Sequence, residues 1–121
     1  MPVFRDDNGA LLSRPHLVSF LTCAAPNLAA IIASQPGHAG SVPAVLKARA
    51  ERILHVAAHR HRSLVLGAWG CGVFGNDAAI VAGAFARALG HAPWFEQVTF
   101  AVHDPRPGAP VRQTFTRILA S

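Results

Sequence analysis

A chain of 121 residues is long enough for one small domain with a hydrophobic core and too short for two. Hydrophobic residues make up 51% of it and charged residues 14%, which excludes intrinsic disorder, and no apolar run reaches the ~18 residues that a membrane-spanning helix needs. The N-terminal residues lack the basic and then apolar pattern of a secretory signal, so we expect a cytoplasmic protein.

The net charge of +5 comes from ten arginines and one lysine against six acidic residues. This balance favours anionic partners, and phosphate in particular, because a guanidinium group can hold two phosphate oxygens at once. The arginines are spread along the chain rather than clustered among aromatic residues, so the sequence predicts no dedicated nucleic-acid face. Cys23 and Cys71 are far apart in the sequence, and we expect both to be free thiols in a reducing compartment.

The hydrophobic pattern predicts an alternation of strands and helices. In chain order we expect a turn over 6–9, a strand over 17–22, a short helix over 28–32, a surface loop over 34–41, a helix over 43–60, a buried strand over 63–68, a helix over 77–89 capped by Gly90, a strand over 97–102, a loop over 104–110 and a short helix over 111–119. This order indicates a parallel sheet covered by helices.

A glycine-rich loop joins the strand over 63–68 to the helix that follows it. Four glycines fall within residues 67–75. Glycine has no Cβ and tolerates positive φ, so the backbone N–H groups of such a loop can converge on an anion, and the helix N-terminus adds partial positive charge. The loop therefore predicts a phosphate or pyrophosphate site. The alternative is a tight strand-to-helix turn that binds nothing.

Residues 70–75 also match the G-x-G-x-x-G pattern of dinucleotide-binding folds. That interpretation requires an acidic residue about 20 positions further on, at the end of the next strand, to bind the ribose hydroxyls. Glu96 precedes the next strand, and Asp104 follows it but lies 34 positions after Gly70 (104 − 70). A Rossmann-like dinucleotide-binding domain is therefore kept only as an alternative.

Residues 64–77 closely resemble the diphosphate-loop segment of the microbial-type poly(ADP-ribose) glycohydrolases, which are macrodomains. Residues 3–7, 18–22, 25–27 and 98–102 resemble the same family in the same order, and Ala78 stands where the family usually has proline. The resemblance covers nearly the whole chain. It implies an α/β class fold, a three-layer α/β/α macrodomain with a mostly parallel sheet. Residues 1–121 are expected to form a single partial domain, its carboxyl-terminal half.

The resemblance also implies an ADP-ribose site, in which the glycine loop wraps the diphosphate with its backbone amides. The expected ligand-binding residues are Gly70, Cys71, Gly72, Val73, Phe74, Gly75 and Asn76. Phe74 is expected beside the distal ribose, and Asn76 and Asp77 are expected to cap the following helix. Asp104 is expected to be a solvated loop acid rather than an adenosine contact. We predict no metal site and no cofactor.

The family hydrolyses ribose–ribose glycosidic bonds in poly(ADP-ribose), using a triple-glycine segment followed by a Gln-Glu-Glu cluster. This sequence contains neither, and its carboxylates are Asp6, Asp7, Glu51, Asp77, Glu96 and Asp104. We therefore predict no catalytic residue in this chain and no activity of the chain alone. Two interpretations stay open: one half of a glycohydrolase, completed by a partner chain that supplies the amino-terminal half, or a non-catalytic ADP-ribose-binding module.

In the family, six strands numbered along the chain lie in the order 1-6-5-2-4-3 across the sheet. The resemblance implies that the strands predicted over 17–22, 63–68 and 97–102 are the fourth, fifth and sixth of these. The second strand, which should lie between the strands over 17–22 and 63–68, has no counterpart here. We therefore expect either that these two strands pair directly or that a gap exposes apolar edges.

Overall fold

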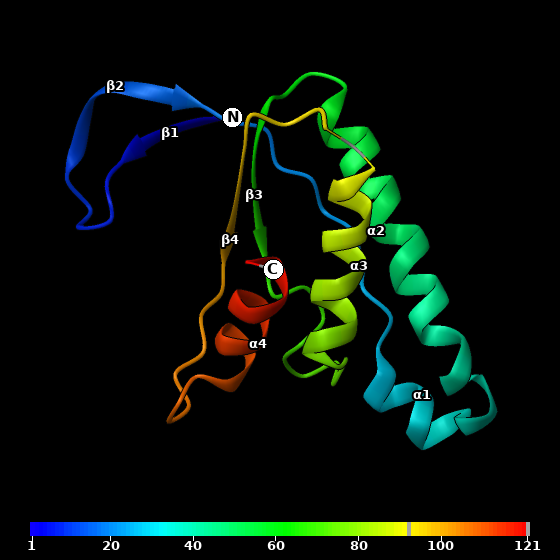
Figure 1. The fold of residues 1–121 in the computed structure, drawn as a ribbon. Coiled ribbons are helices and arrows are strands. Elements are labelled where there is room, and N and C mark those ends of the chain that lie inside the picture. Colours follow the sequence, from blue (N-terminus) through cyan, green and yellow to red (C-terminus); the bar gives the residue numbers. More distant parts are fainter. Residues whose placement is uncertain (92, 121) are drawn as a thin grey trace.

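The computed structural model describes residues 1–91 and 93–120 and combines a β-hairpin, a parallel strand pair and a group of helices (Figure 1). The elements are β1 (Pro2–Arg5), β2 (Leu11–Leu17), α1 (Leu28–Ser34), the 3₁₀ helix η1 (Pro36–Ser41), α2 (Val42–Ala58), β3 (Ser63–Gly67), α3 (Ala78–Gly90), β4 (Gln97–Ala101) and α4 (Pro110–Leu119).

The centre of the fold is a β3–α3–β4 unit in which the two strands run parallel. Leu64 pairs with Val98 and Leu66 with Phe100, and these four side chains are half-buried, whereas the alternate position Val65 is 69% exposed. Because side chains alternate between the two faces of a strand, one face of the pair carries the core and the other is open. The predicted parallel strands over 63–68 and 97–102 are confirmed, and so is the α/β class.

The hydrophobic core lies between the covered face of the strands and the helices. Leu46 and Leu54 of α2, Phe85 of α3 and Phe115 of α4 are almost fully buried. The Phe100 ring connects the layers, since its centroid lies 6.0 Å from that of Phe85 and 5.9 Å from that of Phe115. Figure 1 shows α3 lying between α2 and α4. Helix α3 is therefore the element against which α2 and α4 pack.

The predicted helices are confirmed with small changes at their ends. Helix α2 begins at Val42 with Pro43 in its first turn, and α4 begins at Pro110. The C-terminal cap of α3 is His91 rather than Gly90, because the helix continues through the glycine and the N–H of His91 reaches back to its last carbonyls. The predicted loop over 34–41 contains η1. No helix among the described residues is long and apolar enough to cross a membrane.

The strand predicted over 17–22 is wrong. Leu17 ends β2, and residues 18–22 follow it without regular structure, with Phe20 70% exposed. A strand needs a neighbouring strand for its backbone hydrogen bonds, and none lies beside this apolar run in the described part of the chain. Of the two outcomes expected for this region, direct pairing with β3 is absent, and the apolar segment is exposed instead.

The β1–β2 hairpin was not predicted as a pair of strands, although its turn was. Asp6 accepts hydrogen bonds at Oδ1 from the N–H groups of Asn8 and Ala10, both at 2.9 Å, and Gly9 has a φ of +81°. Only the turn carries a strong local signal, because Leu11–Leu17 includes a proline, an arginine and a histidine. Figure 1 shows the hairpin extending away from the helices.

Candidate functional site

The glycine loop connects the carboxyl end of β3 to the start of α3, as the sequence predicts. Residues 72–75 form a β-turn, in which the N–H of Gly75 donates to the carbonyl of Gly72 at 3.0 Å and Gly75 has a φ of +72°. On either side of the turn, the N–H of Cys71 donates to Ala68 and that of Asn76 to Gly70, both at 3.1 Å. The main chain is therefore held by its own hydrogen bonds at three points.

Three consecutive amides in this loop remain available. Within the described residues, the N–H groups of Gly72, Val73 and Phe74 have no hydrogen-bond partner, and Val73 is 93% exposed. By contrast, Asp77 caps α3, since its Oδ1 accepts from the N–H groups of Ala79 at 2.7 Å and Ile80 at 3.3 Å. The donors that an anion could reach are therefore in the turn itself and not among the capped amides of the helix.

Asn76 braces the loop from inside the protein. Its side chain is part of a residue only 5% exposed, and its Nδ2 donates to the carbonyl of Pro26 at 2.7 Å and to that of Gly70 at 2.9 Å. The expectation that Asn76 caps the helix is wrong, because Asp77 takes that role and the Asn76 amide is turned toward other backbone carbonyls. No group among the described residues donates a hydrogen bond to the buried Asn76 Oδ1.

Gly70 is required where it is for two independent reasons. Its φ is +72°, a conformation that side-chain-bearing residues rarely adopt. A Cβ at this position would also lie 2.6 Å from Nδ2 of Asn76 and 2.7 Å from Cβ of Ala25, which is closer than atoms can pack. At Gly72, in contrast, a Cβ would meet nothing within 4 Å. Gly70 therefore shapes the loop, whereas Gly72 contributes an accessible amide.

A segment from Cys23 to Ala29 is hydrogen-bonded to the glycine loop and to α2. The Trp69 indole Nε1 donates to the carbonyl of Cys23 at 2.9 Å, and Arg49 Nη1 donates to that of Ala24 at 2.8 Å. The N–H of Ala29, in the first turn of α1, donates to the carbonyl of Phe74 at 2.9 Å. These contacts were not predicted, because they join residues 25 to 46 positions apart and no local pattern signals them.

Cys71 lies in the loop but is not poised as a nucleophile. Burial of its half-exposed thiol, reinforced by the negative charge of Asp77, raises the Cys71 pKa to about 11. The thiol is therefore neutral at physiological pH, and its Sγ is 3.6 Å from the carbonyl oxygen of Trp69, to which it donates. A neutral thiol at this position adds no negative charge beside the exposed amides, whose N–H dipoles can still point at an anion.

Asp104 is not the solvated loop acid that the sequence predicts. Its side chain is 4% exposed and accepts from Arg106 Nε at 2.9 Å, from Arg106 Nη2 at 3.0 Å and from the N–H of Val111 at 2.8 Å. The Arg106 guanidinium, together with the backbone N–H groups of Val111 and Arg106, holds the Asp104 pKa well below its ordinary range. Because both carboxylate oxygens accept hydrogen bonds from Arg106 or Val111, Asp104 stabilises the start of α4.

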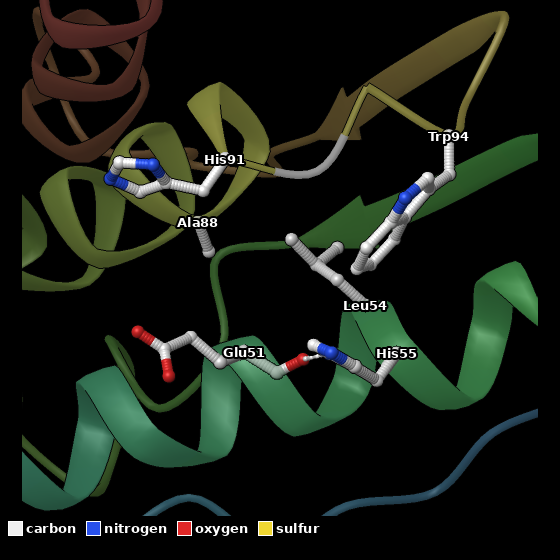
Figure 2. A pocket seen from close by; sticks show the side chains of 6 residues that line it. All are labelled: Glu51, Leu54, His55, Ala88, His91 and Trp94. Atoms are coloured by element: carbon white, nitrogen blue, oxygen red, sulfur yellow. Dashed lines mark hydrogen bonds between the residues drawn. The ribbon is translucent and has the colours of Figure 1, made fainter.

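His55 lies on an exposed face of α2, and His59 is the C-terminal cap of that helix. His55 and His59 are exposed, and the His55 ring meets Trp94 edge-on at a centroid distance of 4.8 Å. In Figure 2 the His55 and Trp94 side chains border a cleft of about 270 Å³, with Leu54 and Ala88 among its other lining residues. The cleft lies at the C-terminal end of α3, and the glycine loop lies at the N-terminal end of that helix. Across the described ranges, no group of three or more His, Cys, Asp or Glu residues could hold a metal ion.

No protein-family model and no curated protein matches the chain. Solved structures do. A poly(ADP-ribose) glycohydrolase from Deinococcus radiodurans in complex with ADP-ribose matches with a TM-score of 0.90 and 47% identity over 98% of this chain and 49% of that chain. The enzyme from Thermomonospora curvata matches with a TM-score of 0.82 and 48% identity, over 97% of this chain and 44% of that chain.

At this level of identity both the sequence and the fold support the resemblance that residues 64–77 carry. The chain spans about half the length of the solved enzymes it matches. In sequence and in fold it is similar to about half of a microbial-type poly(ADP-ribose) glycohydrolase.

Proposed function

We propose that residues 70–75 bind the diphosphate of ADP-ribose through backbone amides. The observation that carries this proposal is the run of three accessible amides at Gly72, Val73 and Phe74, at the carboxyl end of a parallel strand. The net charge of +5 favours approach of an anion. The Deinococcus enzyme that matches this chain was solved with ADP-ribose bound, which agrees in ligand class.

The loop residues divide into those that would contact the ligand and those that hold the contact surface in place. Gly72, Val73 and Phe74 would donate to diphosphate oxygens, and the Phe74 ring, 37% exposed, would lie beside the distal ribose. Cys71 and Gly75 would line the same turn. Gly70 and Asn76 would act through the loop, since Asn76 is buried beneath it.

The test is an NMR titration of the amide resonances with ADP-ribose, comparing Val73→Pro with Val73→Ala. Proline removes one amide donor but suits the second position of the turn, so the fold should survive. We expect shifts centred on residues 72–74, and a dissociation constant about tenfold higher for Val73→Pro than for Val73→Ala. Equal affinities of the two variants, or no shifts in these residues at saturating ADP-ribose, would remove the basis of the proposal.

A parallel titration with NAD separates this function from a Rossmann-like dinucleotide site. Both ligands contain a diphosphate, but NAD adds a nicotinamide ring at the ribose expected beside Phe74. We expect ADP-ribose to bind more tightly than NAD. Tighter binding of NAD would favour the Rossmann-like alternative.

We further propose that this chain alone does not hydrolyse poly(ADP-ribose). Glycosidic cleavage requires a positioned acid, and most carboxylates here are already engaged in structural contacts. Asp6 accepts from two backbone amides of the hairpin turn, and Asp77 caps α3. Asp104 is held by Arg106, and Glu96 pairs with Arg62 at 3.2 Å. An assay for ADP-ribose release from poly(ADP-ribose) by the purified chain should show no turnover, and sustained release would contradict the proposal.

We also propose a cytoplasmic location. Cys23 and Cys71 are both free thiols in the structure, as the sequence predicts, which agrees with a reducing compartment.

A further inference from the structure

A cleft between α2 and α3 takes no part in the proposed diphosphate site. It lies between the C-terminal halves of the two helices, beside the loop that leads to β4, and we call it the α2–α3 cleft (Figure 2). Its volume of about 270 Å³ is below the ~300–1,000 Å³ of pockets that enclose a drug-sized ligand, so it suits a single ring system. It is lined by Glu51, Leu54, His55, Ala88, His91 and Trp94.

The lining combines a buried apolar part with two aromatic walls. Leu54 is 1% and Ala88 4% exposed, whereas Trp94 is 42% exposed and offers part of its indole to solvent. The His55 and Trp94 rings meet at 76°, with their centroids 4.8 Å apart. His55 Nδ1 lies 3.3 Å from the backbone carbonyl oxygen of Glu51, which holds the imidazole in place. A flat ring that stacks on the indole would therefore meet the imidazole edge-on and rest on aliphatic carbon.

The polar groups of the cleft have no partner in the described part of the protein. No hydrogen bond or ion pair there engages the Glu51 carboxylate, the His91 ring or the Trp94 indole N–H. The Trp69 indole, by comparison, donates to the carbonyl of Cys23. Figure 2 shows the Glu51 carboxylate and the His91 ring across the cleft from Trp94. Since an ionised carboxylate only accepts hydrogen bonds, Glu51 favours a ligand that donates them.

Charge narrows the class of ligand further. The net charge of +5 disfavours a cationic ligand, and the described residues contain no group of three or more His, Cys, Asp or Glu that could hold a metal ion. A neutral ring with N–H groups remains. Among the nucleobases, guanine presents two adjacent N–H donors, at N1 and at its 2-amino group, so one carboxylate can accept from both in parallel. Adenine presents one amino group beside ring nitrogens whose lone pairs repel a carboxylate.

We propose that the α2–α3 cleft binds the guanine base of a nucleotide. The base stacks on Trp94 and donates its two N–H groups to the Glu51 carboxylate, while the ribose and phosphate stay in solvent. The positive charge of the chain attracts the phosphate. Among the described residues that line the cleft there is no arginine or lysine, which favours a free nucleotide over a strand of nucleic acid. The proposal does not depend on ADP-ribose binding at the glycine loop.

The experiment is an NMR titration of the chain with GMP and with AMP, followed through the two indole N–H resonances. Both nucleotides carry the same ribose phosphate, so any effect of the phosphate, including binding at the glycine loop, is common to them. We expect GMP to shift the Trp94 indole resonance and to leave that of the hydrogen-bonded Trp69 indole in place. The dissociation constant should be about tenfold higher for AMP than for GMP.

Variants test the two contacts separately, with calorimetry as the common measure of affinity. Glu51→Gln should weaken GMP binding about tenfold and abolish the preference over AMP, because a glutamine amide pairs well with adenine. Asp7→Asn is the matched control, since it removes the same charge from an exposed acid in the hairpin turn, and both affinities should stay within about twofold. Trp94→Ala should weaken both nucleotides about tenfold through lost stacking. Circular dichroism checks that each variant is folded.

Equal affinities of GMP and AMP for the unmodified chain would overturn the proposal, and so would a Glu51→Gln variant that still prefers GMP. The trinucleotide UGU separates a free nucleotide from a nucleic-acid strand. It should bind within about threefold of GMP, and binding more than about tenfold tighter would assign the cleft to nucleic acid instead. ADP-ribose shifts at residues 72–74 are scored separately, so their absence would contradict the diphosphate site and leave the α2–α3 cleft standing.

Discussion

At the scale of single residues, the candidate site separates the atoms that shape the loop from those that would touch a ligand. Gly70 and Asn76 determine the path of the chain, through a positive φ and two hydrogen bonds to carbonyls. The accessible donors are main-chain amides of residues 72–74, and the Val73 side chain among them is 93% exposed. Side-chain identity should therefore matter greatly at 70 and 76 and little at the exposed Val73.

We expect Gly70→Ala to destabilise the protein by about 3 kcal/mol, because the new Cβ combines a strained φ with close contacts to Asn76 and Ala25. Urea unfolding followed by circular dichroism measures the change. Gly72→Ala is the control, and since a Cβ there meets open space, its effect should stay within about 0.5 kcal/mol. Similar losses for the two variants would show that the loop is not packed as described.

At the scale of elements, the sequence predicts whatever depends on local pattern. The apolar runs of β3 and β4, the helical spacing in α2 and α3 and the glycine loop are all found where expected. The strand over 17–22 fails because a strand also requires a neighbour. The Asn76 brace and the Trp69–Cys23 contact could not be foreseen for a related reason, since their partners lie 50 and 46 positions away.

The start of α4 shows how one carboxylate can organise an element. Asp104 binds Arg106 and the N–H of Val111, so Asp104→Asn should lower the midpoint of thermal unfolding. The folded-state pKa of Asp104 lies below its unfolded value, so this stabilisation is fully present above about pH 4 and is lost as the pH falls further. Thermal unfolding of both proteins between neutral and acidic pH should show their difference shrinking below about pH 4. A difference that grew in acid would exclude this role.

At the scale of the whole molecule, the core is one-sided. The helices bury one face of the β3–β4 pair around Phe85, while Val65 on the other face, Phe20 and the β1–β2 hairpin remain exposed. Stability should therefore be distributed unevenly, with the highest local free energy of opening in α3 and the lowest in the N-terminal third of the chain.

Hydrogen exchange of the isolated chain tests this distribution directly. The amides of α3 should exchange slowest, because Val81, Ala82 and Phe85 are fully buried and the helix is packed between α2 and α4. The amides of residues 19–22 should exchange at nearly the rate of an unfolded peptide, since they have no hydrogen-bond partner in the described structure. Measuring at several protein concentrations distinguishes intrinsic protection from self-association. Strong, concentration-independent protection of residues 19–22 would mean that this segment already has a partner within one chain, and the one-sided description of the core would then be wrong.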